Sequence, residues 1–331
     1  MPNSFSDKAA SSPAPVKRLS RFSDDPTGVP LTVSPKDIEI FKLLDPERRY
    51  SILPTNWIQA LLGGDPTWMS KRLGRLSRRP YKYLHRPEEQ WTFNALYKHA
   101  LYRRADKADQ YLIEQGLLRR RAKRRTDALR HQLLDNLVDA SIELGVTADP
   151  ALSLLDWHGI LDHPKTPAAL SDANEPFRLR IGEQSLIPDG RPFVLRRSQA
   201  DGRALSLCIL GKEIDRATEP LRPSRMRHTS IARKFELYRK IFNAKLYQSH
   251  YGFPNAMVLI VTVSETHMQN MMALAAEIMG GKCSYLLFKT IEDFANIARS
   301  PQVSTAMLET PWQRAGYPPF YLSTFSERPR D

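Results

Sequence analysis

The spacing of apolar residues changes character along the chain. In the first 150 residues, apolar side chains recur every three or four positions, a spacing typical of amphipathic helices. Three such segments lie between residues 34 and 79, and Ser34, Thr55 and Asp65 mark their starts, because these residue types cap helix N-termini. After residue 180, alternating and continuous apolar runs of strand length predominate. The pattern therefore predicts a helical N-terminal region followed by a region that contains a β-sheet.

Residues 34–118 have the element order of a winged helix-turn-helix. The three helical segments are followed by two short strand-like segments, at residues 81–84 and 99–103, and by a further helix at residues 105–115. In a winged helix-turn-helix, the third helix enters the major groove of DNA and the β-ribbon rests on the backbone. We therefore expect residues 34–118 to form a DNA-binding domain.

The third predicted helix is strongly basic. Its apolar residues form one stripe, and its cations occupy the other faces: Lys71, Arg72, Arg75, Arg78 and Arg79. A solvated helix face can also be basic, but these five cations exceed what solvation needs. We expect them to bind double-stranded DNA, with Arg72, Arg75 and Arg79 facing the groove or its phosphates.

The net charge of the whole chain points to a similar partner. The chain has 49 Lys and Arg against 36 Asp and Glu, a formal net charge of +13, which favours a polyanion such as nucleic acid. An anionic membrane surface is the lesser alternative, because no apolar run reaches the ~20 residues of a membrane-spanning helix and no signal peptide is visible. Cys208 and Cys283 lie in apolar runs, which predicts buried, reduced thiols and a cytoplasmic location.

Composition divides the rest of the chain. Residues 1–33 are rich in Ser, Pro and cations without periodicity, which predicts a disordered basic tail. Residues 119–150 contain a basic run and then an amphipathic helix that we expect to end at Gly145. The basic run either lies along DNA phosphates or is the solvated start of the helix. We place the second domain at residues 151–322 and a short tail at 323–331.

The second domain has a mixed α/β pattern. Two strands joined through Asp201-Gly202 form a predicted hairpin, and a continuous apolar run marks a buried central strand. In order, we expect strands at 186–197 and 204–216, a helix from 231, a strand at 256–263, a helix at 265–279 and a strand at 283–288. This alternation of strands and helices predicts the α/β class.

Carboxylates interrupt the apolar pattern of the hairpin. If the chain turns at Asp201-Gly202, residues whose numbers add to about 402 or 403 face each other, so Asp189 falls opposite or beside Glu213. Unbroken alternation then places the acids on the apolar face of the hairpin. The residues expected on that face are Ile187, Asp189, Phe193 and Leu195 of the first strand and Leu205, Leu207, Ile209, Glu213 and Asp215 of the second.

Two ionised carboxylates on an apolar face repel each other and lose hydration unless a cation lies between them. Mg²⁺ or Mn²⁺ suits Asp189 and Glu213, because such ions bind one or two carboxylates together with water and a substrate phosphate. The plain alternative is that Pro188-Asp189-Gly190 is an ordinary turn and that residues 212–215 are the polar end of a strand.

Pro188-Asp189, a hydrophobic strand and then Glu213-Ile214-Asp215 resemble the core motif of the PD-(D/E)xK nucleases. In that superfamily the two acids bind metal, and a Lys two residues after the second acid assists the attacking water. This chain has Asp215 at the position of that Lys. The resemblance implies a restriction-endonuclease-like α/β domain in which a Lys of the next helix takes over. Lys234, which flanks the apolar stripe of that helix, is the candidate, and a solvated lysine is the alternative.

The whole order of motifs is similar to that of the replication-relaxation family of bacterial plasmids and other mobile elements. The resemblance covers about residues 35–315 and includes the winged helix, the two acidic motifs, the Lys/Tyr helix and the late Trp312. It implies a role in plasmid replication or DNA relaxation, with double-stranded DNA and other plasmid replication or mobilisation proteins as partners. Whether the second domain is a Mg²⁺-dependent nicking endonuclease or a non-catalytic replication or transcription regulator stays open.

Two further patterns carry less weight. His158 and His163 lie near acidic residues and could ligate a metal, but a polar loop explains them. No glycine-rich loop of the P-loop type occurs, so we expect no nucleotide hydrolysis.

Overall fold

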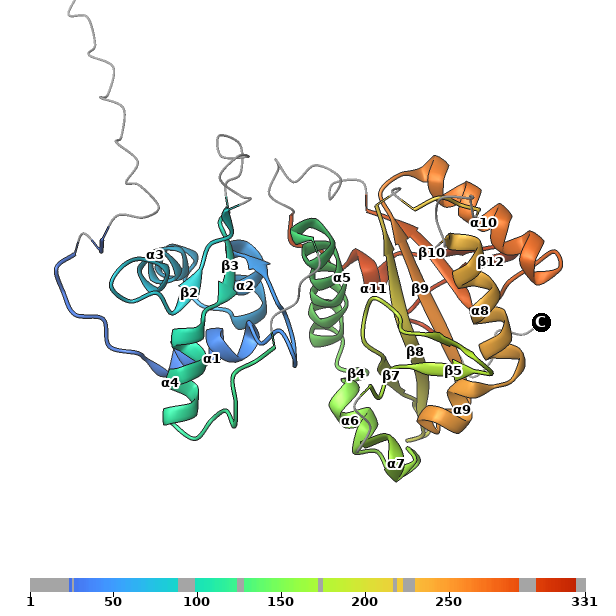
Figure 1. Cartoon of the computed structure of the whole chain (residues 1–331), viewed down its shortest axis with the longest axis horizontal. Helices are drawn as coiled ribbons and strands as arrows, with labels where there is room; N and C mark the ends of the chain where they lie inside the picture. The colour runs from blue at the N-terminus through green and yellow to red at the C-terminus, as the bar shows by residue number, and fades with distance from the viewer. Residues whose placement is uncertain are drawn as a thin grey trace, which may run out of the picture.

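The computed structural model describes residues 24–25, 27–88, 99–123, 128–171, 175–216, 219–222, 230–291 and 302–325. Most of the predicted N-terminal tail, part of the turn of the predicted β-ribbon, the end of the basic run and the last six residues lie outside these ranges. Within them, the chain is a mixed α/β protein with a helical N-terminal lobe and a C-terminal lobe built on a mixed sheet (Figure 1). Among the helices in these ranges, none is both long enough and apolar enough to span a lipid bilayer.

The N-terminal lobe packs its helices against a small antiparallel sheet of order β1-β3-β2. Its elements are α1 (Pro35–Leu43), β1 (Leu53–Pro54), α2 (Thr55–Leu62), α3 (Pro66–Ser77), β2 (Leu84–His85), β3 (Leu101–Arg104) and α4 (Asp106–Glu114). Phe41, Trp57 and Leu73 are fully buried in its core. The predicted sequence of helices and strands is present, although the strand expected at residues 81–84 is reduced to two residues that begin at its end.

The starts of the helices follow their capping residues in two of three cases. Ser34 caps α1 through a reciprocal capping box, and the Asp65 carboxylate caps α3. The prediction that Thr55 caps α2 is wrong. Pro54 occupies the N-cap position, and the Thr55 hydroxyl donates instead to the Ala100 carbonyl at 3.2 Å.

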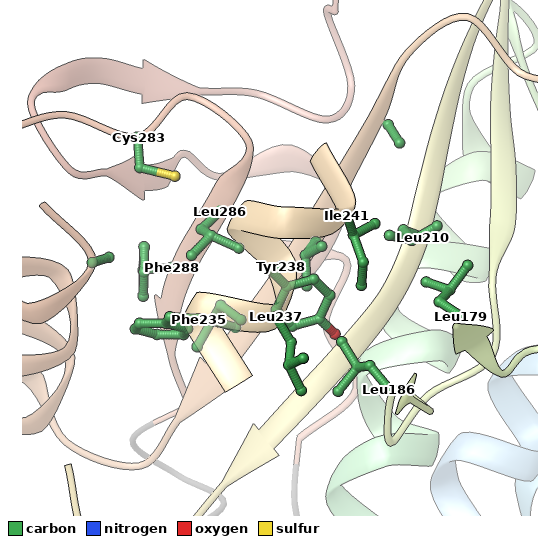
Figure 2. Close-up of a cluster of buried hydrophobic side chains, with 14 of the residues drawn as sticks. Leu179, Leu186, Leu210, Phe235, Leu237, Tyr238, Ile241, Cys283, Leu286 and Phe288 are labelled. Atoms are coloured by element: carbon green, nitrogen blue, oxygen red, sulfur yellow. The ribbon is translucent and has the colours of Figure 1, made fainter. Parts of the chain in front are cut away.

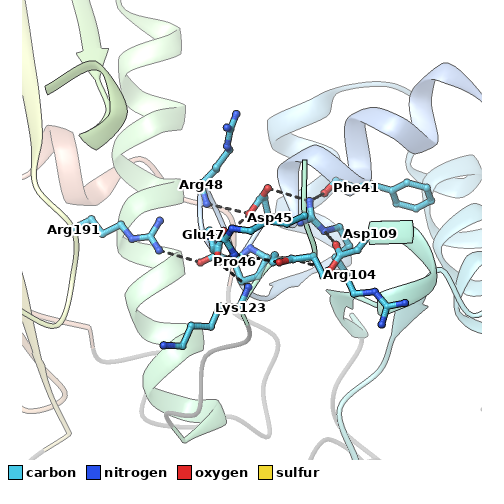
Figure 3. Close-up of polar contacts among 12 residues, drawn as sticks. Phe41, Asp45, Pro46, Glu47, Arg48, Arg104, Asp109, Lys123 and Arg191 are labelled. Atoms are coloured by element: carbon cyan, nitrogen blue, oxygen red, sulfur yellow. Dashed lines mark hydrogen bonds and ion pairs between the residues drawn. The ribbon is translucent and has the colours of Figure 1, made fainter. Parts of the chain in front are cut away.

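A buried arginine joins three elements of this lobe (Figure 3). Arg104 of β3 is 2% exposed, and its Nη1 donates to the Phe41 carbonyl at 2.9 Å. Its guanidinium also pairs with Asp45 at 3.2 Å and with Asp109 at 2.6 Å. A buried guanidinium is costly unless its N–H groups meet acceptors, so these contacts fix the end of α1, β3 and α4 relative to one another.

The helix α5 (Leu129–Ala148) lies between the two lobes and is apolar on two faces (Figure 1). Leu133 and Leu137 belong to the core of the N-terminal lobe, whereas Leu134 and Val138 belong to the core beneath the sheet. The predicted amphipathic helix is therefore a shared wall of both lobes.

The end of α5 differs from the prediction. Gly145 does not end the helix, which continues to Ala148. A Cβ atom at Gly145 would lie 2.6 Å from Leu308 Cδ2, so the glycine allows α11 (Ala306–Glu309) to pack closely on the helix.

The C-terminal lobe contains a seven-stranded sheet of order β12-β11-β10-β9-β8-β7-β4, in which β8, β9 and β10 are parallel and the other pairs are antiparallel. The central strand β9 is buried at every residue, as its continuous apolar run predicts. Helices α8 and α10 cover one face, and α5 and α11 cover the other (Figure 1).

The strands are β4 (Leu152–Leu155), β7 (Phe193–Ser198), β8 (Ala204–Asp215), β9 (Ala256–Thr262), β10 (Leu286–Thr290), β11 (Trp312–Arg314) and β12 (Tyr317–Phe320), with β5 (Leu179–Ile181) and β6 (Gln184–Leu186) in a separate pair. The remaining helices are α6 (Trp157–Leu161), α7 (Ala168–Ser171), α8 (Ile231–Asn243), α9 (Leu246–Tyr251) and α10 (Glu265–Met279).

The hairpin of β7 and β8 has the predicted register. Phe193 lies opposite Ile209, and Ser198 lies opposite Ala204, as a turn at Asp201-Gly202 requires. The ladder between these strands begins only at Phe193, so Asp189 lies before it, in the segment that joins β6 to β7.

A β-bulge changes the face on which the acids of β8 lie. The pairing of β8 with β9 shifts between Ile209 and Gly211. Ile209 and Ile214 both pack on the α5 side, although they are five residues apart. Glu213 therefore points to the α8 side, and the prediction that it continues the apolar stripe of Ile209 is wrong. The same correction applies to Asp215, because a bulge inserts one residue and reverses the alternation beyond it.

The core on the α8 side includes both cysteines and Tyr238, and Figure 2 labels Cys283 and Tyr238. Phe235 of α8 meets Phe288 of β10 edge to face, with ring centroids 6.0 Å apart. Cys208 and Cys283 are free and buried, as predicted. Burial raises the pKa of the Cys208 thiol to about 12, so this side chain behaves as a small apolar group.

Candidate active site at the end of strand β8

Asp189 is held against the end of β8 by backbone hydrogen bonds. The Gly190 N–H donates to the Lys212 carbonyl at 3.1 Å, and the Ile214 N–H donates to Asp189 Oδ2 at 3.1 Å. A Cβ atom at Gly211 would lie 2.3 Å from Pro188 Cβ, so the glycine at the bulge makes room for the turn that carries Asp189. The bulge and the turn thus fit together and fix the first acid.

Lys234 of α8 lies among three carboxylates. Its ammonium is 3.0 Å from Glu213 Oε2, 4.0 Å from Asp189 Oδ2 and 3.2 Å from Glu219 Oε1. Tyr238, one helical turn further along α8, donates its hydroxyl to Glu213 Oε1 at 2.6 Å. The predicted residues Asp189, Glu213 and Lys234 therefore converge, although through the bulge and not through simple strand alternation.

The electrostatics of the site follow from burial. Burial raises the pKa of Glu213 to about 7, against the opposing effect of the Lys234 charge and with a further increase from Asp189. Burial alone would lower the pKa of Lys234, but the charges of Glu213, Asp189 and Glu219 outweigh it and raise that pKa above its ordinary value. The lysine is therefore charged at neutral pH, whereas Glu213 titrates there.

Asp189 and Glu213 are the residues that could hold a divalent cation such as Mg²⁺ or Mn²⁺. Glu213 Oε2 is buried and has no aligned hydrogen bond. The Asp189 side chain is partly exposed and lies near the same Lys234 ammonium. Mg²⁺ is usually bound by one or two carboxylates together with water and substrate phosphate. Among the residues that the structure describes, no group of three or more His, Cys, Asp or Glu side chains could hold a metal ion, so water and substrate would supply most of the ligands.

Sequence reasoning missed several residues around this site. Glu219 and Tyr238 contact the Lys234–Glu213 pair, and His131 of α5 lies 3.9 Å from Asp189. Tyr238 was predictable as a neighbour of Lys234, because residues four apart on a helix share a face. Nothing in the sequence relates His131 to Asp189, since that contact depends on how α5 packs against the sheet.

The fourth predicted site residue, Asp215, has a different partner. Asp215 Oδ2 is hydrogen-bonded to Nε2 of His267, in the first turn of α10. Ser264 caps that turn by accepting from the His267 N–H at 3.2 Å. Asp215 therefore does not join the Lys234 cluster, and His267 is a further residue that the sequence analysis did not identify.

Two of the five predicted DNA-binding cations are bound within the N-terminal lobe. Arg72 pairs with the buried Asp37 through two nitrogens and donates to the Thr32 carbonyl at 2.6 Å. Arg75 pairs with Asp25 at 2.9 Å. The remaining three cations of the segment retain at least partial exposure: Lys71, Arg78 and Arg79. We expected Arg72 and Arg75 to face a DNA groove, but in the structure their guanidinium groups already pair with acidic side chains.

The histidines considered as metal ligands have aromatic neighbours. The His158 ring stacks on Trp157 with centroids 3.4 Å apart, and the His163 ring lies 5.1 Å from that of Phe253. Burial lowers the pKa of both imidazoles.

Comparisons of the chain with protein-family models, with curated proteins and with solved structures return no match. The geometry of the described residues is therefore the basis for any functional assignment.

Proposed function

We propose that this chain is a DNA-binding protein of a plasmid or other mobile element of the replication-relaxation type, and that its C-terminal lobe is a PD-(D/E)xK-like domain that nicks DNA. The observation that carries the proposal is the convergence of Asp189, Glu213 and Lys234, with the Lys234 ammonium 3.0 Å from Glu213 and 4.0 Å from Asp189. A separate helix, α8, supplies the lysine that the motif lacks at position 215.

The residues have distinct roles in phosphodiester hydrolysis. Asp189 and Glu213 would hold Mg²⁺ or Mn²⁺, which would activate water and neutralise phosphate charge when bound. Lys234, kept charged by its carboxylates, stabilises the negative charge that develops on the phosphoryl oxygens. Tyr238 orients Glu213 through its 2.6 Å hydrogen bond.

The N-terminal lobe supports duplex binding as its part of the proposal. Its order of helix, strand, two helices and two strands agrees with a winged helix-turn-helix, in which α3 would be the recognition helix. The net charge of +13 agrees with a polyanionic partner in the cytoplasm.

Nicking of supercoiled plasmid with Mg²⁺ or Mn²⁺ tests the proposal. We expect relaxed circles with the wild-type chain and none with Asp189→Ala. Asp201→Ala, which removes an exposed carboxylate from the hairpin turn, is the matched control and should nick normally. Equal nicking by the wild type and Asp189→Ala, or no nicking by the wild type with either metal, would reject the enzyme.

A second candidate function is a replication or transcription regulator that binds DNA without cutting it. The specific observation in its favour is that the Lys234 ammonium already lies between the carboxylates, where it supplies a cation to Glu213 and Glu219. This regulator would shift plasmid mobility in gels with unchanged affinity after Asp189→Ala, and would cleave no DNA.

A further inference from the structure

A second polar cluster lies at the carboxyl ends of β8 and β9, just beyond the acids. Thr262 is the partner of Asp215 in the parallel ladder, and Asp215 Oδ2 is bonded to His267. Asp215 is 7% exposed and Thr262 is 1% exposed. Within the described ranges, neither Asp215 Oδ1 nor Thr262 Oγ1 has a hydrogen-bond partner. Buried polar oxygens without partners are rare, so these two oxygens are available to a water molecule or a ligand.

The cluster is close to the candidate active site. Glu213 and Asp215 are two positions apart on one strand, so their side chains point to the same face about 7 Å apart. His267 reaches this edge from the first turn of α10, and its side chain is 16% exposed. Because Asp215 binds Nε2, Nδ1 is the ring nitrogen that can meet a ligand, and no described residue bonds it.

We propose that His267 is a catalytic residue that donates a proton to the leaving oxygen of the phosphodiester, with Asp215 as its positioning residue. The inference rests on the nuclease function proposed above. The water oxygen forms a bond to phosphorus, and the bond from phosphorus to the leaving sugar oxygen breaks. The electron pair of that bond stays on the sugar oxygen, which takes the proton from Nδ1, while the proton of the attacking water passes to solvent. Asp215 accepts a hydrogen bond from Nε2 and fixes the ring orientation.

This arrangement supplies a proton donor that Lys234 cannot replace. Three carboxylates hold the Lys234 proton firmly, because their charges raise its pKa above the ordinary value. The His267 ring, held by the single carboxylate of Asp215, is the basic side chain available for general acid catalysis. The two basic side chains thus have separate tasks, charge stabilisation and proton donation.

The test compares two substrates that differ in their need for an acid. Supercoiled plasmid has a sugar alkoxide as leaving group, whereas bis(4-nitrophenyl) phosphate releases a nitrophenolate that departs without protonation. We expect His267→Gln to slow plasmid nicking by about 10²–10⁴-fold, in kcat and not in KM, and to leave hydrolysis of the nitrophenyl ester nearly unchanged. Asp215→Asn should show the same pattern with a smaller loss. His163→Gln replaces a partly exposed histidine elsewhere in the lobe and should behave as wild type.

Two readouts without turnover accompany these assays. The rise in melting temperature with Mn²⁺ and the affinity for plasmid in Ca²⁺ should both persist in His267→Gln, since the ring binds neither metal nor DNA in the ground state. Equal slowing of both substrates, unchanged plasmid nicking, or loss of the Mn²⁺ response in His267→Gln would each overturn the proposal. A wild-type chain that hydrolyses neither substrate would overturn the nuclease function itself, which is a distinct result.

Discussion

Two lysine clusters lie on opposite faces of the same strand. The closed cluster comprises Lys212, Asp135 and Asp139, and the open cluster comprises Lys234, Asp189, Glu213 and Glu219. Lys212 and Glu213 are sequence neighbours, so the two clusters are separated only by the thickness of β8. The Lys212 side chain is 0% exposed, whereas that of Lys234 is 26% exposed.

The same chemical groups have different roles in the two clusters, depending on their access to water. In the closed cluster the lysine is surrounded by fixed acceptors, including the Asp135 carbonyl at 3.2 Å, and joins α5 to the sheet. In the open cluster three carboxylates outnumber one lysine, and the excess negative charge can attract a cation from solvent. The closed cluster is thus structural, and the open cluster is the better candidate for chemistry.

The largest effect should come from breaking the closed cluster. Lys212→Met leaves Asp135 and Asp139 without their cation, and we expect a loss of about 3–5 kcal/mol in the free energy of unfolding. Lys234→Met should cost under about 2 kcal/mol, because Glu213 can take up a proton and the other acids reach water. Urea denaturation of both variants, with Lys240→Met on the exposed side of α8 as control, measures the difference. Equal losses for Lys212→Met and Lys234→Met would remove the distinction between the clusters.

The pH dependence of the open cluster is the next largest effect. The folded-state pKa of Glu213, about 7, lies above the ordinary 4.5, so the folded chain holds this proton more tightly than the unfolded chain. The resulting stabilisation is complete below pH 4.5 and is lost as the pH rises through 7, by about 3 kcal/mol. Glu213→Gln should therefore be more stable than wild type at pH 8 and equally stable at pH 4.5. Parallel pH profiles of the two proteins by chemical denaturation would refute the burial argument.

Divalent metal should stabilise the protein through the open cluster, and this effect should be slightly smaller than the pH effect. At a hundredfold excess over its dissociation constant, Mn²⁺ should stabilise the wild type by about 2.7 kcal/mol through the open cluster. Asp189→Asn and Glu213→Gln should lose this response, and Asp201→Asn should keep it. Thermal melts with and without Mn²⁺ decide the matter: the same shift in all four proteins would mean that the metal binds elsewhere.

The smallest effect extends the comparison to the cations of α3 and of the residues directly after it. Arg72→Ala removes the cation beside the buried Asp37, whose carboxylate keeps its hydrogen bonds from the N–H and hydroxyl of Ser34. It should therefore cost only about 1–2 kcal/mol in stability, with little change in the salt dependence of DNA binding. Arg79→Ala should leave stability within about 0.5 kcal/mol but lower the salt slope of duplex binding by about 1. Urea denaturation and salt titrations of DNA affinity give the two quantities. The reverse pattern would show that Arg72 leaves Asp37 to bind phosphate.

Local signals in the sequence predicted much of this fold. Ser34 and Asp65 start their helices because each side chain caps its own first turn, and the register of the hairpin follows from the short turn after Ser198. The sequence also predicted that Asp189 and Glu213 converge, but the register alone does not bring them together, because Asp189 lies before the ladder and the bulge turns Glu213 to the other face.

The remaining features depend on contacts between distant segments. The bulge that turns Glu213 toward α8 accompanies the close approach of Pro188 to Gly211, which alternation of side chains cannot reveal. His267 meets Asp215 only because β9 lies next to β8, and the order of strands is not written in local periodicity. The sequence also led us to expect that Arg72 binds DNA, and it did not predict the ion pair of Arg72 with Asp37.

The position of α5 determines how the two lobes can come apart. Leu133 and Leu137 complete one core, and Leu134 and Val138 complete the other, so no cut before or after this helix leaves both halves with a full apolar interior. Helix α5 is therefore an element shared by both lobes and not a hinge between them. Tyr50 and Ile52 of the first lobe also bond Glu143 and Asn136 of this helix, at 2.6 and 2.9 Å. Unfolding should therefore be a single cooperative event that spans both lobes. A duplex bound at α3, as proposed above, would have one fixed orientation relative to the C-terminal lobe.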